Sequence, residues 1–359
     1  MCRRPPMNST NKTGDFDPSV YPELKIAGII NFYWPLVLLG VGIPGNLIVI
    51  GVSCLKHHRN NSYIHYMGAL AVFDTIGLLV SGLLRWLLQN IENCKQSNES
   101  CKWGKYISIT NYGCSVYIII AMTFDRYLAV TSPMNVTRYS SISRTWKAII
   151  GIVVVMTAFN IPFHVYSNKV TNKMTGIAIC DTFASEDLLA KVYPWLSMAL
   201  TAILPCVVLV ALNAKIVRTL SQASRPDKLK DMGDTLHRFR SYQARQVTRM
   251  LVAVSIAFIV LTSPFYIWEV MGTFIYTENN AWSKASRLLV NKTTVMIWLS
   301  NNAVNFYIYA LTGQKFRRDL KSLFCRGNRE NLPRNMKNAF GMRIWKVPQK
   351  AIDHEITYM

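Results

Sequence analysis

Two acids and one arginine stand in or beside otherwise apolar stretches of this sequence. Asp125 and Arg126, followed by Tyr127, end a run without charged residues that begins at Tyr106. Asp74 lies inside a second apolar stretch. A carboxylate in lipid is costly unless it is paired or faces protein, whereas an arginine at the end of a span can reach water. These residues therefore indicate a membrane boundary with a charge pair that can switch, and a polar site within the membrane.

A second chemical feature is the base Arg85, which follows the stretch that holds Asp74, and the acid Glu269, which follows a further apolar stretch. Charges that face a cavity in a membrane protein usually meet a ligand or each other. Arg85 could bind an acidic group or a terminal carbonyl, and Glu269 could bind an amine or a basic side chain. The alternatives are a bridge between the two, or side chains that extend to the lipid head groups.

The sequence does not indicate an enzyme or a nucleic-acid-binding protein. No cluster combines a nucleophile, a base and an orienting group. The formal net charge of +21 is typical of nucleic-acid-binding domains. Here, however, the basic residues flank the apolar stretches and form no separate basic stripe, so we expect no nucleic-acid partner.

Seven apolar stretches long enough to cross a membrane as helices position these residues. The chain of 359 residues is 51% hydrophobic and 16% charged, which is a membrane-protein composition. Prolines inside the stretches do not argue against helices, because neighbouring groups can satisfy the freed carbonyls. The predicted fold class is an all-α membrane protein, a seven-transmembrane helix bundle. The predicted spans are residues 26–55, 63–84, 106–124, 148–166, 192–214, 250–268 and 293–314.

The distribution of basic residues predicts the orientation. With the N-terminus outside, the inner segments hold 26 of the 40 Lys and Arg, and positive residues favour the cytoplasmic side. We therefore expect a plasma-membrane protein with an extracellular N-terminal tail (1–26), the bundle (27–314), an amphipathic juxtamembrane helix (315–326) and a cytoplasmic tail (327–359). Residues 1–25 lack the apolar segment of a cleavable signal peptide, so the first span is expected to direct insertion.

Short patterns predict covalent modification at both faces. Asn8, Asn11 and Asn98 each begin an Asn-x-Ser/Thr pattern in a predicted extracellular segment, so they are glycosylation candidates. Residues 316–324 place apolar side chains at helical spacing opposite basic ones, as in helices that lie on the inner leaflet. Cys325, at the end of this helix, is a candidate for palmitoylation, with a plain thiol as the alternative.

Short motifs recur in a fixed order along the predicted spans. They are Gly45-Asn46, Leu70-Ala71-Val72-Phe73-Asp74, Cys101, Asp125-Arg126-Tyr127, Ser132-Pro133, Trp146, Pro205, Phe258, Pro264, Asn305, Tyr309 and Phe316. In this order and spacing the chain resembles the rhodopsin-like (class A) G-protein-coupled receptors over roughly residues 27–325. The resemblance implies a ligand pocket in the outer half of the bundle and a heterotrimeric G protein at the inner face. Membrane lipids, arrestin and receptor kinases are further partners that it suggests.

The resemblance implies a switch at the inner face. Arg126 would pair with Asp125 in the resting receptor and release it to meet the G protein. Tyr127, Asn305 and Tyr309 would complete the coupling residues. Allosteric coupling requires an element with two states whose balance is changed by the ligand at one end and by the G protein at the other.

The resemblance also implies a disulfide and an ion site. Cys101 and Cys180 match the cysteines that join the third span to the second outer loop. Around Asp74 the family binds an allosteric sodium ion, and we expect no other cofactor. The alternative is a protonated, hydrogen-bonded Asp74. The candidate sodium-site residues are Asp74, Asn111, Ser115, Asn301 and Asn305.

Four positions depart from the family pattern. Thr262 replaces the usual sixth-span Trp, Phe306 the seventh-span Pro and Asn213 a fifth-span Tyr. Ala244 stands where many members carry an acid that holds Arg126. These departures put in doubt the sixth-span Trp as an aromatic trigger of activation, the kink of the seventh helix and the acid that latches Arg126 at the inner face. A weak latch predicts activity without ligand.

The outer half favours a short amphipathic peptide as ligand, because it combines an aromatic wall with one acid and one base. Ser108 stands where amine receptors carry Asp, and Leu299 where opsins carry Lys, so neither ligand class is favoured. The basic third inner loop, Ser132-Pro133 and the missing Trp resemble invertebrate neuropeptide receptors of the FMRFamide type. The alternatives are an orphan or chemosensory receptor for a small molecule, or a transporter, which should show internal repeats. The predicted ligand-binding residues are Arg85, Ser108, Tyr112, Ser197, Thr262, Phe265, Tyr266, Glu269, Val295 and Trp298.

Overall fold

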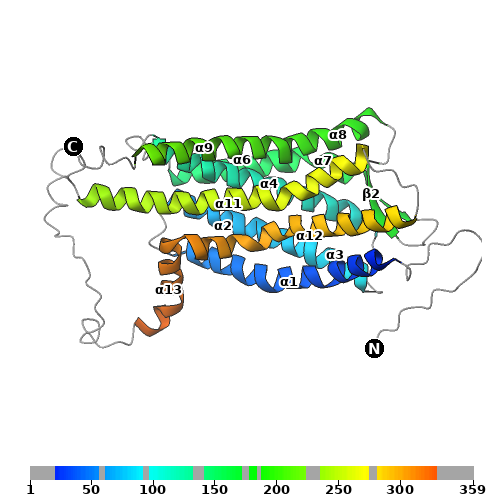
Figure 1. The fold of residues 1–359 in the computed structure, drawn as a ribbon, viewed down its shortest axis with the longest axis horizontal. Coiled ribbons are helices and arrows are strands. Elements are labelled where there is room, and N and C mark those ends of the chain that lie inside the picture. The colour runs from blue at the N-terminus through cyan, green and yellow to red at the C-terminus, as the bar shows by residue number, and fades with distance from the viewer. Residues whose placement is uncertain are drawn as a thin grey trace, which may run out of the picture. The chain divides into compact units, whose positions relative to one another are not determined.

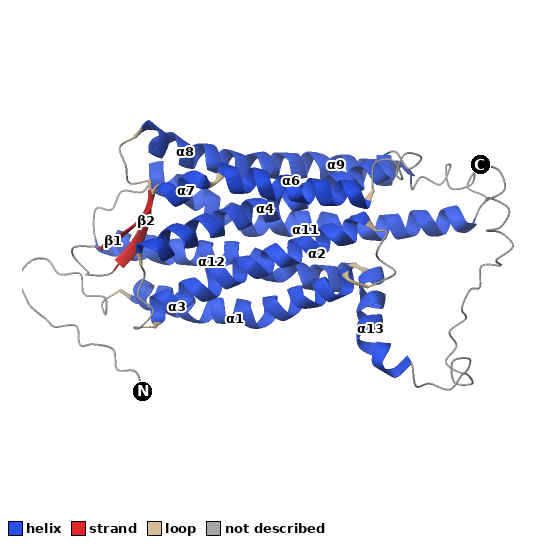
Figure 2. Cartoon of the chain, turned by 180° about the vertical axis from the view of Figure 1, so that it is seen from behind, coloured by secondary structure: helices blue, strands red, loops and turns tan. Residues whose placement is uncertain are grey.

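The computed structural model describes residues 21–55, 61–91, 97–131, 141–171, 178–183, 187–223, 235–274 and 281–329. Long helices run side by side over most of these residues (Figures 1 and 2). The elements are α1 (Pro22–Ser53), α2 (Ser62–Gly77), η2 (Leu78–Leu84), α3 (Arg85–Asn90), α4 (Asn98–Thr131), α6 (Ile142–Phe159), α7 (Ile161–Val165), β1 (Ser167–Thr171), β2 (Ala178–Thr182), α8 (Leu188–Met198), η4 (Ala199–Ile203), α9 (Leu204–Ala223), α11 (Thr235–Phe274), α12 (Ala281–Thr312) and α13 (Gln314–Arg329).

Among the described residues, six helices are long and apolar enough to cross a membrane. They are Pro22–Ser53, Ser62–Asn90, Asn98–Thr131, Ile142–Phe159, Leu188–Gln222 and Gln246–Gly272. The seventh predicted span lies in α12, which packs against α1 and α11. Its first half carries Lys284, Arg287 and Lys292, so its composition is more polar than that of the others. The protein is thus a multi-pass helical membrane protein.

Several helices extend beyond the charge-free stretches that predicted them. A charge-free run marks only the part of a helix that hydrocarbon surrounds, whereas backbone hydrogen bonding continues into the head groups. Helix α4 therefore begins at Asn98, not near residue 106, and α1 begins at Pro22. Helix α13 extends past both predicted ends, 315 and 326.

Helix α12 runs without a break past the position where the family pattern has Pro. Phe306 occupies that position, and the α-helix continues from Ala281 to Thr312. Phe306 packs closely against α1, because a Cβ added to Gly45 would lie 3.0 Å from the Phe306 Cβ. The absence of Pro keeps the local backbone hydrogen bonds, so the expected loss of the usual kink is consistent with this helix.

Two wide π-helical segments, η2 and η4, interrupt the second and fifth spans. Such segments are rare and occur frequently at functional sites, because they rotate the side chains that follow. Segment η2 ends immediately before Arg85. In η4, the Leu200 carbonyl accepts a hydrogen bond of 2.9 Å from the Tyr117 hydroxyl.

A disulfide ties the start of α4 to a short hairpin. Strands β1 and β2 are antiparallel, with Lys169 opposite Cys180. Cys180 forms the disulfide with Cys101, with 5.5 Å between the Cα atoms, so the predicted pairing is present. We call this end of the bundle, which also carries α3, α7 and α8, the disulfide end (Figures 1 and 2). The opposite end, where α4 finishes, is the Arg126 end.

Close packing in the bundle depends on small residues. A Cβ added to Gly42 would lie 2.6 Å from Leu78 Cδ1 and 2.8 Å from Ala303 Cβ. Glycine at this position therefore lets α1 approach η2 and α12, as small residues do in membrane helix packing. Leu78 and Ala303 belong to a buried core cluster that also contains Leu38, Val295, Met296 and Leu299.

Three predicted modification sites receive little or no structural description. Asn8 and Asn11 lie outside the described residues. The side chain of Cys325 also lies outside them, although its backbone is in α13. Asn98 begins α4 on the exposed surface of the disulfide end, where its amide oxygen accepts a hydrogen bond from the Lys169 N–H at 3.0 Å. Glycosylation and palmitoylation therefore stay predictions.

Candidate functional site

At the Arg126 end, Arg126 is bound to Asp125 and to the start of α2. The Arg126 guanidinium forms an ion pair with Asp125, and its Nε donates to Asp125 Oδ2 at 3.1 Å. The Ser62 hydroxyl donates to the same oxygen at 3.0 Å and accepts from Arg126 at 3.3 Å. Asp125 is only 8% exposed, so water does little to weaken this network.

The ring of Tyr63 adds a second contact from α2. The Arg126 guanidinium carbon lies 4.9 Å from the ring centre, and the Lys315 ammonium lies 5.6 Å from the same centre. Both distances allow cation–π attraction. Sequence reasoning missed Ser62 and Tyr63, because only the folded bundle places the start of the second span beside the end of the third. The side chain of Ala244 lies outside the described residues.

In the middle of the bundle, Asp74 is fully buried among polar side chains. Asn305 donates to its Oδ2 at 2.7 Å, and the Ser115 hydroxyl lies 3.5 Å from its Oδ1. Asn111 is buried nearby, since a Cβ on Gly77 would contact its amide nitrogen at 2.9 Å. The structure thus gathers most of the residues predicted around Asp74, and Asn301 is buried as well.

Oxygen atoms in this region are available to a cation. The Asn111 side-chain oxygen and the Tyr309 hydroxyl are buried and have no hydrogen-bond partner among the described residues. Carboxylate, hydroxyl and amide oxygens are the ligands that hard cations prefer. The residues present therefore fit a small hard cation such as sodium.

Toward the disulfide end, four predicted aromatic residues from α4, α11 and α12 meet. The Tyr112 ring centre is 5.1 Å from that of Trp298 and 6.2 Å from that of Tyr266. Phe265 lies 5.6 Å from Trp298 and 5.2 Å from Tyr266. The Tyr112 hydroxyl and the Trp298 indole N–H are buried, and neither makes a well-aligned hydrogen bond within the part of the chain that the structure describes. This aromatic cluster therefore combines apolar rings with two buried polar groups, which a ligand would reach by displacing a ring.

The remaining predicted ligand residues differ in how available they are. Ser108 on α4 accepts a hydrogen bond of 3.0 Å from Ser81. Thr262 is buried, and its hydroxyl is bonded to the Phe258 carbonyl at 2.7 Å. Val295 belongs to the core cluster, and Ser197 is buried on α8. These four contribute more to packing than to an open surface in this structure.

Charged side chains at the disulfide end form a larger network than the predicted Arg85 and Glu269. Those two residues do not bridge, because Arg85 forms no ion pair among the described residues. Glu269 instead lies within electrostatic range of Lys105 and Arg287. Lys105 and Arg287 were not among the predicted site residues, because they precede the charge-free stretches 106–124 and 293–314. The extended helices α4 and α12 carry both into the site.

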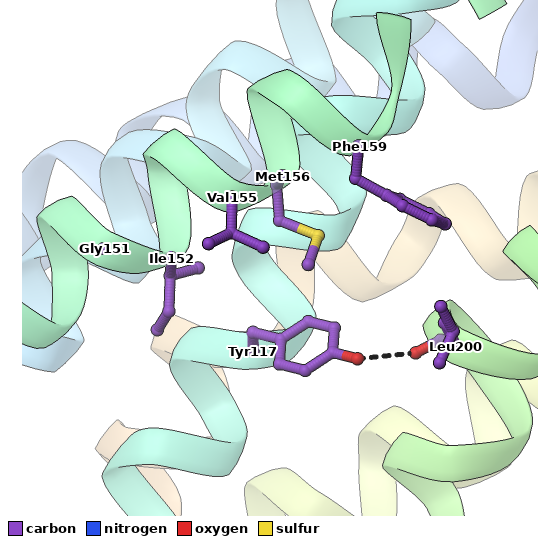
Figure 3. Close-up of a pocket in the computed structure, with 7 residues that line it drawn as sticks. All are labelled: Tyr117, Gly151, Ile152, Val155, Met156, Phe159 and Leu200. Atoms are coloured by element: carbon purple, nitrogen blue, oxygen red, sulfur yellow. Dashed lines mark hydrogen bonds between the residues drawn. The ribbon is translucent and has the colours of Figure 1, made fainter. Parts of the chain in front are cut away.

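A separate apolar cavity of about 340 Å³ lies between α4, α6 and η4 (Figure 3). Figure 3 shows the Tyr117 hydroxyl directed at the Leu200 carbonyl beneath residues of α6. Val155, which lines the cavity, is 58% exposed on a membrane-spanning helix, so this cavity lies on the lipid-facing side of α6. Its lining is Tyr117, Gly151, Ile152, Val155, Met156, Phe159 and Leu200. None of the predicted ligand residues lies in it.

The architecture and the two ends together define a multi-pass membrane receptor. The sequence matches the model of the 7 transmembrane receptor (rhodopsin family) over residues 45–309. That range is more than half of the chain, and the chain belongs to this family. It is therefore a G-protein-coupled receptor, not an enzyme and not a transporter.

The chain is similar over most of its length to receptors from vertebrates and nematodes. It is 25% identical to the thyrotropin-releasing hormone receptor of Gallus gallus, over 89% of this chain and 84% of that protein. It is 24% identical to the galanin-like G-protein coupled receptor npr-9 of Caenorhabditis elegans, over 84% and 74%. It is 26% identical to the neuromedin U receptor homolog nmur-2 of the same organism, over 80% and 76%.

Proposed function

We propose that this receptor binds a short neuropeptide at the disulfide end and activates a heterotrimeric G protein at the Arg126 end. The observation that carries the proposal is the aromatic cluster, which places the polar groups of Tyr112 and Trp298 below a network of charged side chains. Such a site suits a ligand with both aromatic and charged groups. The names of the similar proteins, which include a hormone receptor and a neuromedin U receptor homolog, support a peptide ligand.

Contacts between α4 and α11 link the two ends. Tyr112 stacks near Phe258, with ring centres 6.5 Å apart. Further toward the Arg126 end, the hydroxyls of Thr123 and Ser255 lie 3.4 Å apart. A peptide that displaces Tyr112 would change the packing of Phe258 and so the position of α11 relative to α4. In this account the Tyr112–Phe258 contact takes the role of the usual sixth-span Trp. Thr262, which stands at that position, uses its hydroxyl in a hydrogen bond to the Phe258 carbonyl of its own helix.

At the Arg126 end, activation would release Arg126 from Asp125 and from α2. In this structure Arg126 is held by Asp125, Ser62 and Tyr63, and we assign this arrangement to the resting receptor. Its release would free a cation to meet the G protein, with Tyr127 beside it. Tyr309, which is buried against Phe316 at a ring distance of 5.7 Å, would move with α12.

Sodium bound near Asp74 would favour the resting packing. Asp74, Ser115 and Asn111 would supply the oxygen ligands, and Asn305 orients the Asp74 carboxylate through its hydrogen bond. The ion would neutralise a buried carboxylate that is otherwise costly within the membrane. Asn301 is the remaining candidate in this polar region.

We also propose the plasma membrane as the location, with the N-terminus extracellular and the C-terminus cytoplasmic. The excess of basic residues in the inner segments supports this orientation. Arrestin and receptor kinases would then act at the Arg126 end, and anionic lipids would contact the basic segments there. Assignment to the FMRFamide-type group stays a prediction from the sequence.

A neuropeptide library applied to cells that express the chain tests this function. Calcium or cyclic-AMP reporters in these cells should respond to at least one peptide. The same peptide should give no response in mock-transfected cells. Trp298→Ala should weaken the response, whereas Trp282→Ala, an exposed tryptophan on the same helix, should not. If no peptide of the library activates the wild type, and a parallel small-molecule screen yields an agonist, a peptide ligand is contradicted.

A further inference from the structure

The charges at the disulfide end are unbalanced in the part of the chain that the structure describes. Arg85 lies within electrostatic range of Lys105 and Lys292, and both are bases. The acids of the network lie elsewhere: Lys105 is in range of Glu269 and Asp181, and Glu269 is in range of Arg287. The network thus joins four bases, Arg85, Lys105, Arg287 and Lys292, to two acids, Asp181 and Glu269.

The positions of Arg85 and Lys105 follow from a hydrogen bond one turn below them. Ser81 donates to Ser108 at 3.0 Å and joins η2 to α4. Arg85 follows Ser81 by four residues, and Lys105 precedes Ser108 by three. Because the second span runs toward the disulfide end and α4 runs away from it, both bases lie on the disulfide side of this bond. The fold therefore fixes two cations beside each other.

Lys292 approaches the same region from α12. It lies one helical turn before Val295 of the core cluster and two turns toward the disulfide end from Leu299. Arg85 and Lys292 are half-buried and are in range of each other. Neither has an ion-pair partner among the described residues. Two half-buried cations without an anion repel each other, and this cost is removed when an anion binds between them.

The aromatic cluster lies deeper on the same helices. Tyr112 follows Lys105 by two turns of α4, and Trp298 follows Lys292 on α12. Tyr112 and Trp298 are in ring contact at 5.1 Å. An aromatic or apolar ligand group could therefore pack on this cluster while a group nearer the outside meets the bases. Glu269 and Asp181 already lie near Lys105, so the unmatched positive charge is at Arg85 and Lys292.

We propose that the ligand carries a carboxylate, as an acidic side chain or a free C-terminus, that binds between Arg85 and Lys292. This inference rests on the proposed function, in which a peptide binds at the disulfide end. It names a ligand class that the sequence left open, since Arg85 was expected to meet either an acid or a terminal carbonyl. Lys105 would assist from α4 while Glu269 holds it in place.

Matched peptide pairs test the inference in cells that express the full chain. Each library peptide is made with a free C-terminus and as the carboxamide, and each Asp or Glu is also replaced by Asn or Gln. The carboxylate member of an active pair should act at about tenfold to hundredfold lower concentration than its neutral twin, as expected for a desolvated charge-assisted contact. Calcium and cyclic-AMP reporters give the dose–response.

Variants then locate the carboxylate. Arg85→Gln and Lys292→Gln should each reduce the difference between the twins to less than about threefold, while Arg85→Lys should preserve most of it. Lys284→Gln removes a charge from an exposed position on α12 and should leave the difference unchanged. Staining of an N-terminal tag on intact cells shows which variants reach the surface, and potency is compared only for those.

The outcomes separate this inference from the proposed function. Equal potency in every pair, both at the C-terminus and at each acidic side chain, or a potent peptide without any carboxylate, would overturn the carboxylate site while leaving a peptide receptor in place. A full carboxylate preference in both Gln variants would also overturn the site between Arg85 and Lys292. A library in which no peptide of any charge is active would contradict the proposed function itself.

Discussion

The guanidinium of Arg126 lies against the ring of Tyr63, with 4.9 Å between its central carbon and the ring centre. The motif around Arg126 predicted pairing with Asp125 only, and Ala244 predicted a weak latch. The structure adds α2 to the residues that hold Arg126. Because Ser62 and Tyr63 are adjacent, a small shift of α4 relative to α2 would break both contacts together.

We expect Tyr63→Leu to raise the signal in the absence of ligand. The substitution removes a cation–π contact worth about 0.5–2 kcal/mol, which corresponds to a shift of about 2- to 30-fold toward the released state. Tyr63→Phe keeps the ring and should stay near the wild type. The measurement is cyclic-AMP or calcium reporter output at equal surface expression. Equal basal output of the Leu and Phe variants would show that the ring does not restrain Arg126.

Asp74→Asn should remove the effect of sodium on basal activity. Sodium at Asp74 favours the resting packing in our account, so NaCl should lower basal nucleotide exchange in wild-type membranes relative to choline chloride at equal ionic strength. Asn keeps the size of the side chain but loses the charge that attracts the cation. GTPγS loading of the G protein measures the effect. A wild-type receptor that responds equally to the two salts would argue against a sodium site.

Gly42→Ala should lower thermal stability. The new methyl would lie 2.6 Å from Leu78 Cδ1, and such overpacking typically costs about 1–3 kcal/mol. Gly40→Ala is the matched control, because nothing lies within 4 Å of an added Cβ there. It should keep or slightly raise stability, since Ala favours helix over Gly by about 1 kcal/mol. Thermal unfolding of the purified receptors in detergent gives the comparison, and a Gly42→Ala variant as stable as Gly40→Ala would contradict the close packing of α1.

Cys180→Ser should reduce the amount of folded receptor at the cell surface. The disulfide joins residues separated by 79 positions, and loss of a native disulfide commonly costs about 2–5 kcal/mol. Cys54→Ser is the control, because Cys54 is a free, exposed cysteine. Flow cytometry of an N-terminal tag provides the measurement. Normal surface levels and normal ligand potency in Cys180→Ser would show that the hairpin is positioned without the bond.

Hydrophobic length and local motifs predicted the helical class and the family, and the resemblance to that family implied the disulfide between Cys101 and Cys180. The sequence also predicted the aromatic residues that meet at Tyr112 and Trp298, since their helix positions follow from the spans. It did not predict the role of Lys105, because a base outside a charge-free stretch is assigned to a loop until the helix is seen to continue. It did not choose between a ligand contact and a bridge for Arg85, because side-chain partners depend on how the helices pack. The wide turn η2, which ends just before Arg85, has no sequence signature that we recognise.

The most direct test of the central claim is the position of the two termini relative to the plasma membrane. The account has a ligand act from outside at the disulfide end and a G protein act from inside at the Arg126 end, which requires an odd number of spans. An epitope tag on the N-terminus should bind antibody on intact cells, and a tag on the C-terminus should bind only after permeabilisation. Detection of both tags on the same side of the membrane would contradict the receptor account.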